Sequence, residues 1–314
     1  MIVDLPDTTV SAISKTLVAL REEGGVVALG RVLTLIIITD PEHEEAAIEA
    51  ANAASREHPM RVLVLRQEPH ADEADPHLDA EIRLGGDAGA SEVIVLRAYG
   101  AAASDHDSLV TGLLLPDAPV VAWWSRTTSA DVADTPVGRI ATRRITDYRT
   151  AGGAKRALRS LARHSASGDT DLAWTRITLW RSQLAAVLDQ PPYETVERVE
   201  VEGASDSRAV VLLAAWLALA LDCPVDLRLG HAKADGGYGV DAVRLVRASG
   251  TIELVRTSPA TARLIQPGQP THDIAMPQRT DPECLAEELR RLDPDEVYER
   301  VLTEGLPLPR TVES

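Results

Sequence analysis

The stretch DTDLAWTRITLWRSQLAAVLDQ, residues 169–190, predicts a helix between two parts of the chain. Each of its first three residues has a side-chain oxygen that can cap a helix by accepting a hydrogen bond from a free backbone N–H group. At its other end the stretch runs into Pro191-Pro192, which no helix continues through. We therefore predict an N-terminal domain at 1–168 and a C-terminal domain at 169–314 that starts with this linker helix.

Two of the five tryptophans of the chain lie on this predicted helix, and arginines stand beside them. Trp174 and Trp180 are accompanied by Arg176 and Arg181, whose guanidinium groups each offer five N–H donors. Tryptophan and arginine are the residue types that interface hot spots favour. One interpretation is a partner surface with exposed or half-buried indole rings, and the other is that both rings are buried in a seam between the domains. We keep the four residues as candidate partner contacts.

Residues 139–163 are basic in an otherwise acidic chain. Eight Lys or Arg stand there against one acid, Asp147, whereas the whole chain has a formal net charge of -16. Arg156, Arg159 and Arg163 fall on one face of a predicted helix and can pair bidentately with carboxylates or phosphates. The alternative is a solvated face that binds nothing. These three arginines are further candidate partner contacts.

Alternating strands and helices predict an α/β fold. The run VLTLIIIT, residues 32–39, is apolar without alternation, which is typical of a central strand covered on both faces. A helix at 42–57 and a strand at 60–65 complete a parallel unit. Further elements are predicted as strands at 80–84, 93–97, 119–124, 194–201 and 225–229, helices at 105–115 and 205–221, a hairpin at 240–256, and acidic helices after 281. The fold class is thus two α/β domains, each a mixed or mostly parallel sheet flanked by helices.

Two segments of the chain read alike, one beginning at Val93 and one at Val196. In each, a strand is followed by Gly-Ala, a Ser-Asp cap, a leucine-rich helix, and Asp-x-Pro-Val into a second strand. An internal duplication explains this likeness, and so does the turn chemistry that both segments need. Both explanations stay open at the level of sequence.

Composition argues against nucleic acid as a partner. Affinity for DNA or RNA comes largely from Lys and Arg that neutralise phosphates, so a chain with a net charge of -16 is repelled as a whole. The chain contains no Phe, which leaves few aromatic surfaces on which bases could stack. We expect no nucleic-acid binding.

The cysteines and the N-terminus predict a cytoplasmic protein. Two cysteines, Cys223 and Cys284, cannot build the disulfide framework of a secreted protein, and free buried thiols are the favoured interpretation. The opening MIVDLPDTT has neither the basic start nor the apolar run of a secretory signal. The most apolar predicted helix, 209–221, is shorter than the roughly 20 residues that span a bilayer. We expect no membrane association.

No motif in the sequence predicts a catalytic, cofactor or metal site. Acidic and histidine residues crowd one loop without the spacing of a zinc helix or an EF-hand: His70, Asp72, Glu73, Asp75, His77 and Asp79. His106 between Asp105 and Asp107 has the composition of a general-base pair, but Asp105 is interpreted as a helix cap. The glycines of the 236–239 turn have no following helix that would favour phosphate. We expect no cofactor and no metal.

Three stretches resemble one protein family: LPDTT at 5–9, GRVLTLIIITD at 30–40, and DLAWTR with WR shortly after it, from 171 to 181. They are similar to the OpcA family, described as assembly proteins or allosteric effectors of glucose-6-phosphate dehydrogenase. The resemblance implies a non-catalytic partner that promotes assembly of this enzyme or raises its activity in the oxidative pentose phosphate pathway, and so affects NADPH supply. It transfers no catalytic residue. The alternative is an enzyme or sensor that binds a sugar phosphate or nucleotide at the carboxyl ends of its parallel strands.

Overall fold

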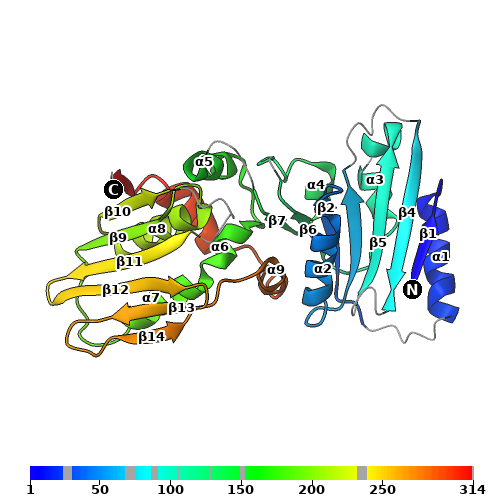
Figure 1. Ribbon diagram of the computed structural model, residues 1–314. Coiled ribbons are helices and arrows are strands. Elements are labelled where there is room, and N and C mark those ends of the chain that lie inside the picture. The colour runs from blue at the N-terminus through cyan, green and yellow to red at the C-terminus, as the bar shows by residue number, and fades with distance from the viewer. Residues whose placement is uncertain are drawn as a thin grey trace. The chain divides into compact units, whose positions relative to one another are not determined.

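The computed structural model describes residues 1–23, 30–67, 75–85, 91–104, 106–127, 129–148, 153–231 and 239–312. The chain forms two compact units (Figure 1). Unit 1 comprises Met1–Tyr148, Ala166–Thr170 and Asp281–Pro294, and unit 2 comprises Arg149–Ser165, Asp171–Thr280 and Asp295–Ser314. The domain boundary at residues 168 and 169 stays a prediction, because these units are defined by contacts and not by independent folding.

Unit 1 is built around an eight-stranded sheet with the order β1-β4-β5-β3-β2-β6-β7-β8. The strands are β1 (Ile2–Leu5), β2 (Leu33–Thr39), β3 (Met60–Arg66), β4 (His77–Leu84), β5 (Glu92–Tyr99), β6 (Val120–Trp124), β7 (Arg143–Thr146) and β8 (Asp169–Asp171). All seven residues of β2 are buried, as its unbroken apolar run predicts for a central strand. β2 pairs in parallel with β3 and β6, β3 with β5, and β6 with β7. β4 is antiparallel to β5, and β1 is antiparallel to β4.

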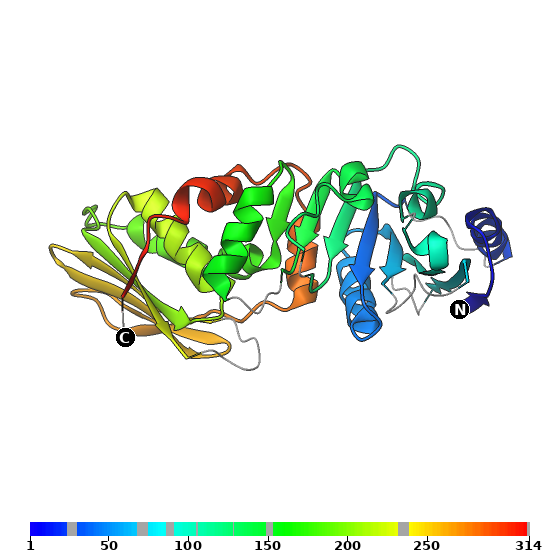
Figure 2. The ribbon, with the colours of Figure 1, turned by 90° about the horizontal axis from the view of Figure 1, so that it is seen from above.

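Helices cover both faces of this sheet. One face packs against α1 (Val10–Glu23), α3 (His106–Thr111) and α4 (Pro136–Ile140), whose apolar side chains share a buried cluster with those of the central strands. The short helix η3 (Gly100–Ser104) precedes α3. The other face is covered by α2 (Glu44–Ala54), against which α9 (Asp281–Leu289) packs (Figure 2). Unit 1 is therefore a three-layer α/β structure.

Unit 2 contains a seven-stranded mixed sheet with the order β14-β13-β12-β11-β9-β10-β15. Its strands are β9 (Arg198–Ala204), β10 (Val225–Gly230), β11 (Val240–Arg247), β12 (Gly250–Ser258), β13 (Thr261–Ile265), β14 (His272–Ala275) and β15 (Arg310–Val312). β9, β10 and β15 run in parallel, and β11 to β14 form an antiparallel meander. Buried and more accessible residues alternate along β9 and β10, which is the pattern of a sheet covered on one face.

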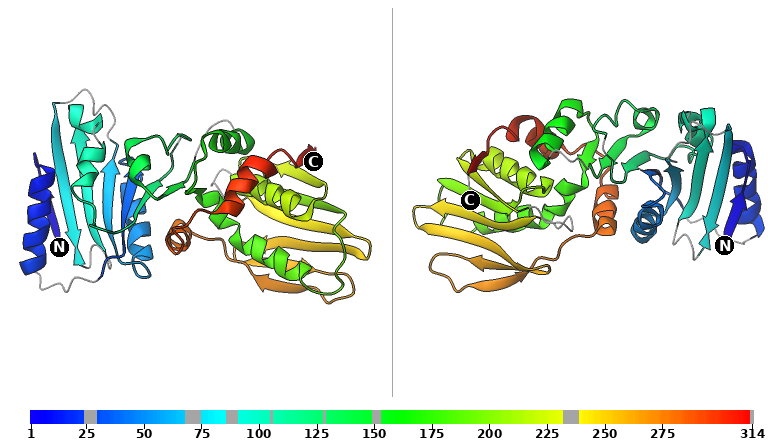
Figure 3. Two further views of the ribbon diagram at one scale, coloured as in Figure 1. Left: turned by 180° about the vertical axis from the view of Figure 1, so that it is seen from behind. Right: turned by 45° about the horizontal axis from the view of Figure 1, so that its top comes forward.

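Helices lie against one face of the second sheet, as Figure 3 shows from behind. They are α5 (Ala154–His164), α6 (Leu172–Arg176), α7 (Thr178–Leu188), α8 (Arg208–Leu221), α10 (Glu296–Arg300) and η4 (Val301–Gly305). Nine residues of α8 are buried, and α8 contacts β9, β10, α5, α6 and η4, so it is the central helix of the unit. The predicted fold class, two α/β units with mixed sheets and flanking helices, is confirmed.

The predicted linker helix is divided differently in the structure. Asp169–Asp171 form the short strand β8, and the helical part is split at Ile177 into α6 and α7. The carboxylate of Asp171 caps α6 by accepting a hydrogen bond from the N–H of Ala173 at 2.9 Å. Of the three residues that the sequence offers as caps, Asp171 is therefore the one that acts, and three consecutive residues with capping side chains do not indicate which one it is.

The two similar segments occupy different topologies. In unit 1, β5 and β6 are separated in the sheet by β3 and β2. In unit 2, the corresponding strands β9 and β10 are direct parallel neighbours. This difference argues against an internal duplication and favours shared turn chemistry.

In the described part of the chain, no helix is both long and apolar enough to cross a membrane.

Candidate functional site

The helix α5 presents the three predicted arginines on its outer face. Its inner residues, Ala154, Ala157, Leu158 and Leu161, are buried where α5 packs on α8 and η4. Arg156, Arg159 and Arg163 are exposed. The segment is rich in Ala, Leu and Arg, which are strong helix formers, so one apolar face fixes the orientation of the basic one.

The outer face of α5 carries no compensating acid. Among the described residues, no carboxylate lies within ion-pair distance of the three α5 arginines, although Arg163 donates through Nε to the carbonyl of Arg159 at 3.2 Å. No acid stands in the first turn of α5. Burial lowers the pKa of Lys155, and the neighbouring charge of Arg159 lowers it further. The face is therefore a cluster of like charges whose donors are available to a partner.

The indole of Trp174 is an internal element of unit 2. Its side chain is 1% exposed, and its Nε1 donates to the Asp295 carboxylate at 2.8 Å. The Arg181 guanidinium lies over the ring at 3.6 Å from its centroid, and the ring of Tyr298 is at 5.7 Å. Of the two interpretations of the sequence, the exposed or half-buried ring does not hold here, and the buried ring does, although it is buried within unit 2. Helical spacing in sequence does not reveal that Asp295 and Tyr298, more than 100 residues away, pack over this face.

The indole of Trp180 is buried as well, at 3% exposure. The guanidinium of Arg256 on β12 lies 5.4 Å from its ring centroid and donates to the carbonyl of Met276 at 2.9 Å. Burial lowers the pKa of Arg256. Arg176 and Arg181 are half-buried. The pairing of Trp with Arg, which suggested a partner surface, is thus mostly satisfied inside the unit.

Other members of the basic stretch 139–163 have internal partners in unit 1. Arg143 is buried and pairs with Glu288 of α9 at 2.5 Å. Arg144 is buried and pairs with Asp169 at 2.5 Å. The charge surplus seen in the sequence is therefore not a continuous surface. Its exposed described arginines are Arg139, which donates to the carbonyl of Asp134, and the three of α5, while Arg149 lies outside the described residues.

Several sequence predictions fall outside the described residues: His70, Asp72, Glu73, Asp105, Gly236 and Gly237. Within the described part of the chain, no three His, Cys, Asp or Glu side chains are grouped so that they could hold a metal ion. Cys223 of unit 2 is half-buried, Cys284 of unit 1 is buried, and neither forms a disulfide. Burial raises the pKa of the Cys223 thiol, and the charge of Asp222 adds to that rise.

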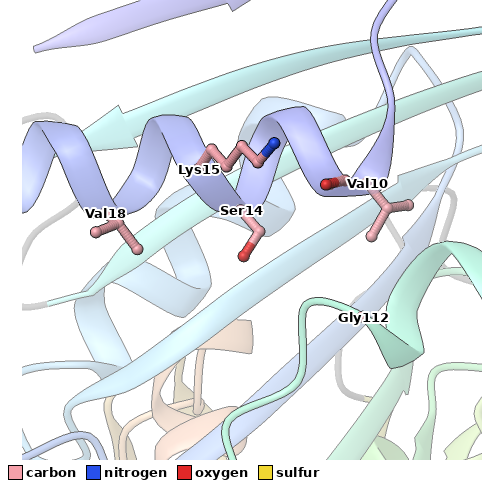
Figure 4. A pocket seen from close by; sticks show the side chains of 6 residues that line it. Val10, Ser14, Lys15, Val18 and Gly112 are labelled. Carbon is pink, nitrogen blue, oxygen red and sulfur yellow. The ribbon is translucent and has the colours of Figure 1, made fainter.

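An open hollow of about 640 Å³ lies beside α1 in unit 1 (Figure 4). It is lined by Val10, Ser11, Ser14, Lys15, Val18 and Gly112. A ligand site normally combines an apolar lining with several converging polar groups. This hollow has a single charged side chain, Lys15, and contains none of the candidate residues, so we do not assign it a ligand.

Comparison with known proteins identifies the family. A model described as the N-terminal domain of a glucose-6-phosphate dehydrogenase subunit matches residues 51–163, and one described as the C-terminal domain of such a subunit matches residues 167–302. No curated protein matches the sequence.

One solved structure with some likeness is titled "Trehalose-6-phosphate from E. coli bound with UDP-2-fluoro glucose", at 10% identity and a TM-score of 0.26. The match covers 64% of this chain and 66% of that chain, just under two thirds, and similarity at this level carries no argument. The two family matches, in contrast, follow one another along the sequence and together cover most of it. The chain belongs to the OpcA family of glucose-6-phosphate dehydrogenase assembly subunits.

Proposed function

We propose that this chain is a non-catalytic subunit that binds glucose-6-phosphate dehydrogenase in the cytoplasm and promotes its assembly or allosterically raises its activity. Family membership supplies the identity of the partner. The observation that carries the docking site is the outer face of α5, where Arg156, Arg159 and Arg163 are exposed in a chain of net charge -16. Through this enzyme the subunit affects the oxidative pentose phosphate pathway and the supply of NADPH.

The α5 arginines favour an acidic patch on the enzyme. A guanidinium group binds a carboxylate through two parallel N–H donors, and this geometry fixes orientation as well as adding affinity. Complementary charges on the two surfaces also steer their encounter. The matching surface is expected to present Asp or Glu side chains at a spacing that meets successive turns of α5.

Assembly or activation requires differential binding. A subunit shifts its partner between two states only by binding one of them more tightly. A tenfold shift needs roughly 1.4 kcal/mol of difference. A few charge-assisted hydrogen bonds from α5, formed with one oligomeric or conformational state and lost in the other, are sufficient for an effect of that size.

The segment 174–181 contributes to the proposed site mainly by shaping unit 2. Trp174 and Trp180 are buried there, which leaves only the accessible parts of Arg176 and Arg181 for direct contact. We therefore place the main contact on α5 and treat these two arginines as candidates for its periphery.

Light scattering after size exclusion tests the proposal, with the chain alone, the dehydrogenase alone, and the two mixed at several micromolar. Co-elution with an altered substrate response is the expected result. Its loss in a variant that replaces Arg156, Arg159 and Arg163 by Ala would place the contact on α5. Separate elution at concentrations well above a micromolar Kd, which corresponds to roughly -8 kcal/mol of binding, would reject the proposal.

A ligand-binding function keeps one observation in its favour. The parallel strands of unit 1 follow the order β5-β3-β2-β6-β7, so the direction of winding reverses between β2 and β6. Sheets of this kind hold ligands beyond the carboxyl ends of the strands at such a reversal. A rise in melting temperature with glucose 6-phosphate or NADP, in the absence of the dehydrogenase, would support this alternative.

A further inference from the structure

Three arginines of unit 1 converge on one buried carboxylate, that of Glu92. Glu92 is the first residue of β5 and is fully buried. Arg61 on β3 donates through Nε to its Oε1 at 2.6 Å. Arg21, near the end of α1, donates through Nη2 to Oε2 at 2.6 Å, and Nη2 of Arg31, just before β2, lies 2.8 Å from Oε2. The cluster lies at the amino-terminal edge of the parallel strands, because β2, β3 and β5 all begin beside it.

This amino-edge cluster, defined as Arg21, Arg31, Arg61 and Glu92, is not balanced in charge. Three guanidinium groups face one carboxylate, and no other carboxylate lies within ion-pair distance of them among the described side chains. A second cluster of charged side chains on the same sheet differs. There three arginines pair with three glutamates: Arg66, Arg83 and Arg97 with Glu44, Glu45 and Glu81. Among the described side chains, the amino-edge cluster therefore has two positive charges in excess, whereas the second cluster is balanced.

The surplus has an energetic signature. Burial lowers the pKa of the Arg31 guanidinium, and the nearby charges of Arg21 and Arg61 lower it too, against the attraction of Glu92. For Glu92, burial raises the pKa, but the hydrogen bond from Arg21 and the charges of the three arginines outweigh that effect and hold the pKa below its usual value. The single carboxylate is thus stabilised by more positive charge than it can neutralise, and the charge of Arg31 is only partly compensated.

The remaining donors of the cluster are unequally used. Arg61 donates through Nη1 to the carbonyls of Leu113 and Leu114, at 2.5 and 3.5 Å, and its side chain is 9% exposed. Arg21 and Arg31 are 28% and 14% exposed. In the described part of the chain, Arg21 directs its hydrogen bonds to Glu92 alone, and Arg31 has the ion pair with Glu92 but no hydrogen bond of good geometry. Donors of these two side chains are left for another group.

We propose that Arg21 and Arg31 bind a phosphate group at the amino edge of the unit 1 sheet, with Glu92 and Arg61 as the positioning residues. A phosphate monoester or free phosphate near neutral pH carries close to two negative charges, which is the surplus that the cluster presents. Two guanidinium forks suit its oxygens, because each fork offers paired N–H donors in one plane. The site lies at the opposite edge of the sheet from the carboxyl ends of its strands.

Thermal unfolding of the full chain, without the dehydrogenase, tests the site with inorganic phosphate as the probe. Sodium chloride at matched ionic strength is the reference, so that screening is subtracted. The expected result is a saturable rise in melting temperature for the natural sequence. For Arg31→Gln we expect phosphate binding at least tenfold weaker and, without phosphate, a melting temperature equal to or above that of the natural sequence, because a repelling charge is removed.

Arg83→Gln is the matched control. Arg83 has a similar exposure of 11% and belongs to the same sheet, but it pairs with two glutamates. We expect this variant to melt at a lower temperature in both buffers and to keep its response to phosphate. The proposal is overturned if the melting temperature of the natural sequence does not respond saturably to phosphate. It is also overturned if Arg31→Gln lowers the melting temperature equally with and without phosphate, because an ion-pair cluster that binds no ligand would behave in this way.

Glucose 6-phosphate and glucose separate two sources of the same group. Tighter binding of glucose 6-phosphate than of inorganic phosphate, with no response to glucose, assigns the site to a sugar phosphate. Equal binding of the two phosphates assigns it to free phosphate. The outcome is independent of docking to the dehydrogenase, because the α5 variant without Arg156, Arg159 and Arg163 is expected to keep the full phosphate response.

Discussion

The arginines of α5 and those beside the two tryptophans lie in the same unit, and their surroundings are opposite. Arg156, Arg159 and Arg163 are exposed, with no carboxylate in ion-pair distance among the described residues. Arg181 lies 3.6 Å over the ring of Trp174, whose own N–H is bonded to a carboxylate. A guanidinium already engaged by a buried ring stabilises the fold, whereas one left in solvent beside like charges is available for binding. The two regions should therefore respond to substitution in different measurements.

The largest effect is expected from Trp174→Ala. The substitution removes a side chain that is 1% exposed, together with its hydrogen bond to Asp295 and its contact with Arg181. Loss of a buried large aromatic side chain typically costs about 3–5 kcal/mol of unfolding free energy. Urea unfolding of the full chain, followed by circular dichroism, measures it. Trp174→Phe keeps most of the ring volume and should lose less. A loss below about 1 kcal/mol for the Ala variant would mean that the segment does not support unit 2.

The second effect is expected from Ala at Arg156, Arg159 and Arg163 together. Affinity for the dehydrogenase should fall roughly 10- to 100-fold, about 1.4–2.8 kcal/mol, because charge-assisted hydrogen bonds to the partner are lost. The unfolding free energy should stay within about 0.5 kcal/mol of the natural value, since exposed side chains contribute little to it. Titration calorimetry and urea unfolding measure the two quantities.

A matched control for this triple variant removes three arginines with similar exposure from the same unit. Arg198, Arg263 and Arg300 are 48%, 48% and 60% exposed, and each pairs with a carboxylate of unit 2. Their joint replacement by Ala changes the net charge equally and should leave affinity unchanged. Equal weakening by both variants would assign the effect to overall charge and remove α5 from its proposed role.

Sequence patterns predicted features that depend on neighbouring residues. The apolar run at 32–39 has no polar residue to turn outward except threonines, so a strand buried on both faces follows from the run itself. The face of α5 is also local, because the spacing of its arginines and leucines fixes which side chains point outward. In both cases the residues that determine the feature lie within a single strand or within neighbouring turns of a single helix.

Features that depend on distant residues were not predictable in the same way. The sequence suggested that Arg143 and Arg144 are surface charges. In the structure Arg143 pairs with Glu288, 145 residues away, and Arg144 pairs with Asp169, so both arginines are buried. Trp174 read as a possible surface ring, and the residues that cover it come from 121 positions further along the chain. The short strands β7 and β8 are held by sheet pairing and not by local propensity, which is why no pattern in four or three residues indicated them.

A smaller effect is expected from Arg181→Met, which keeps the aliphatic bulk and removes the charge above the ring of Trp174. Cation–π contacts of this kind contribute about 0.5–2 kcal/mol, and the half-buried position of Arg181 favours about 1 kcal/mol. We expect that loss in urea unfolding with no change in affinity for the dehydrogenase beyond twofold. A tenfold loss of affinity with unchanged stability would reverse the assignment and make Arg181 a direct contact.

The smallest effect should have the opposite sign. Arg159 stands three residues after Arg156 and four before Arg163, so on a helix it neighbours both, and it also lowers the pKa of Lys155. Each like-charge pair at such spacing costs about 0.2–0.5 kcal/mol, and Ala is the strongest helix former. Arg159→Ala is therefore expected to stabilise the free chain by about 0.5 kcal/mol at low salt. The gain should shrink as added salt screens the charges, while affinity for the dehydrogenase falls. A stabilised chain that binds its partner less well is what a face kept for binding predicts, whereas a loss of stability at Arg159 would mean that this arginine, like Arg181, belongs to the fold.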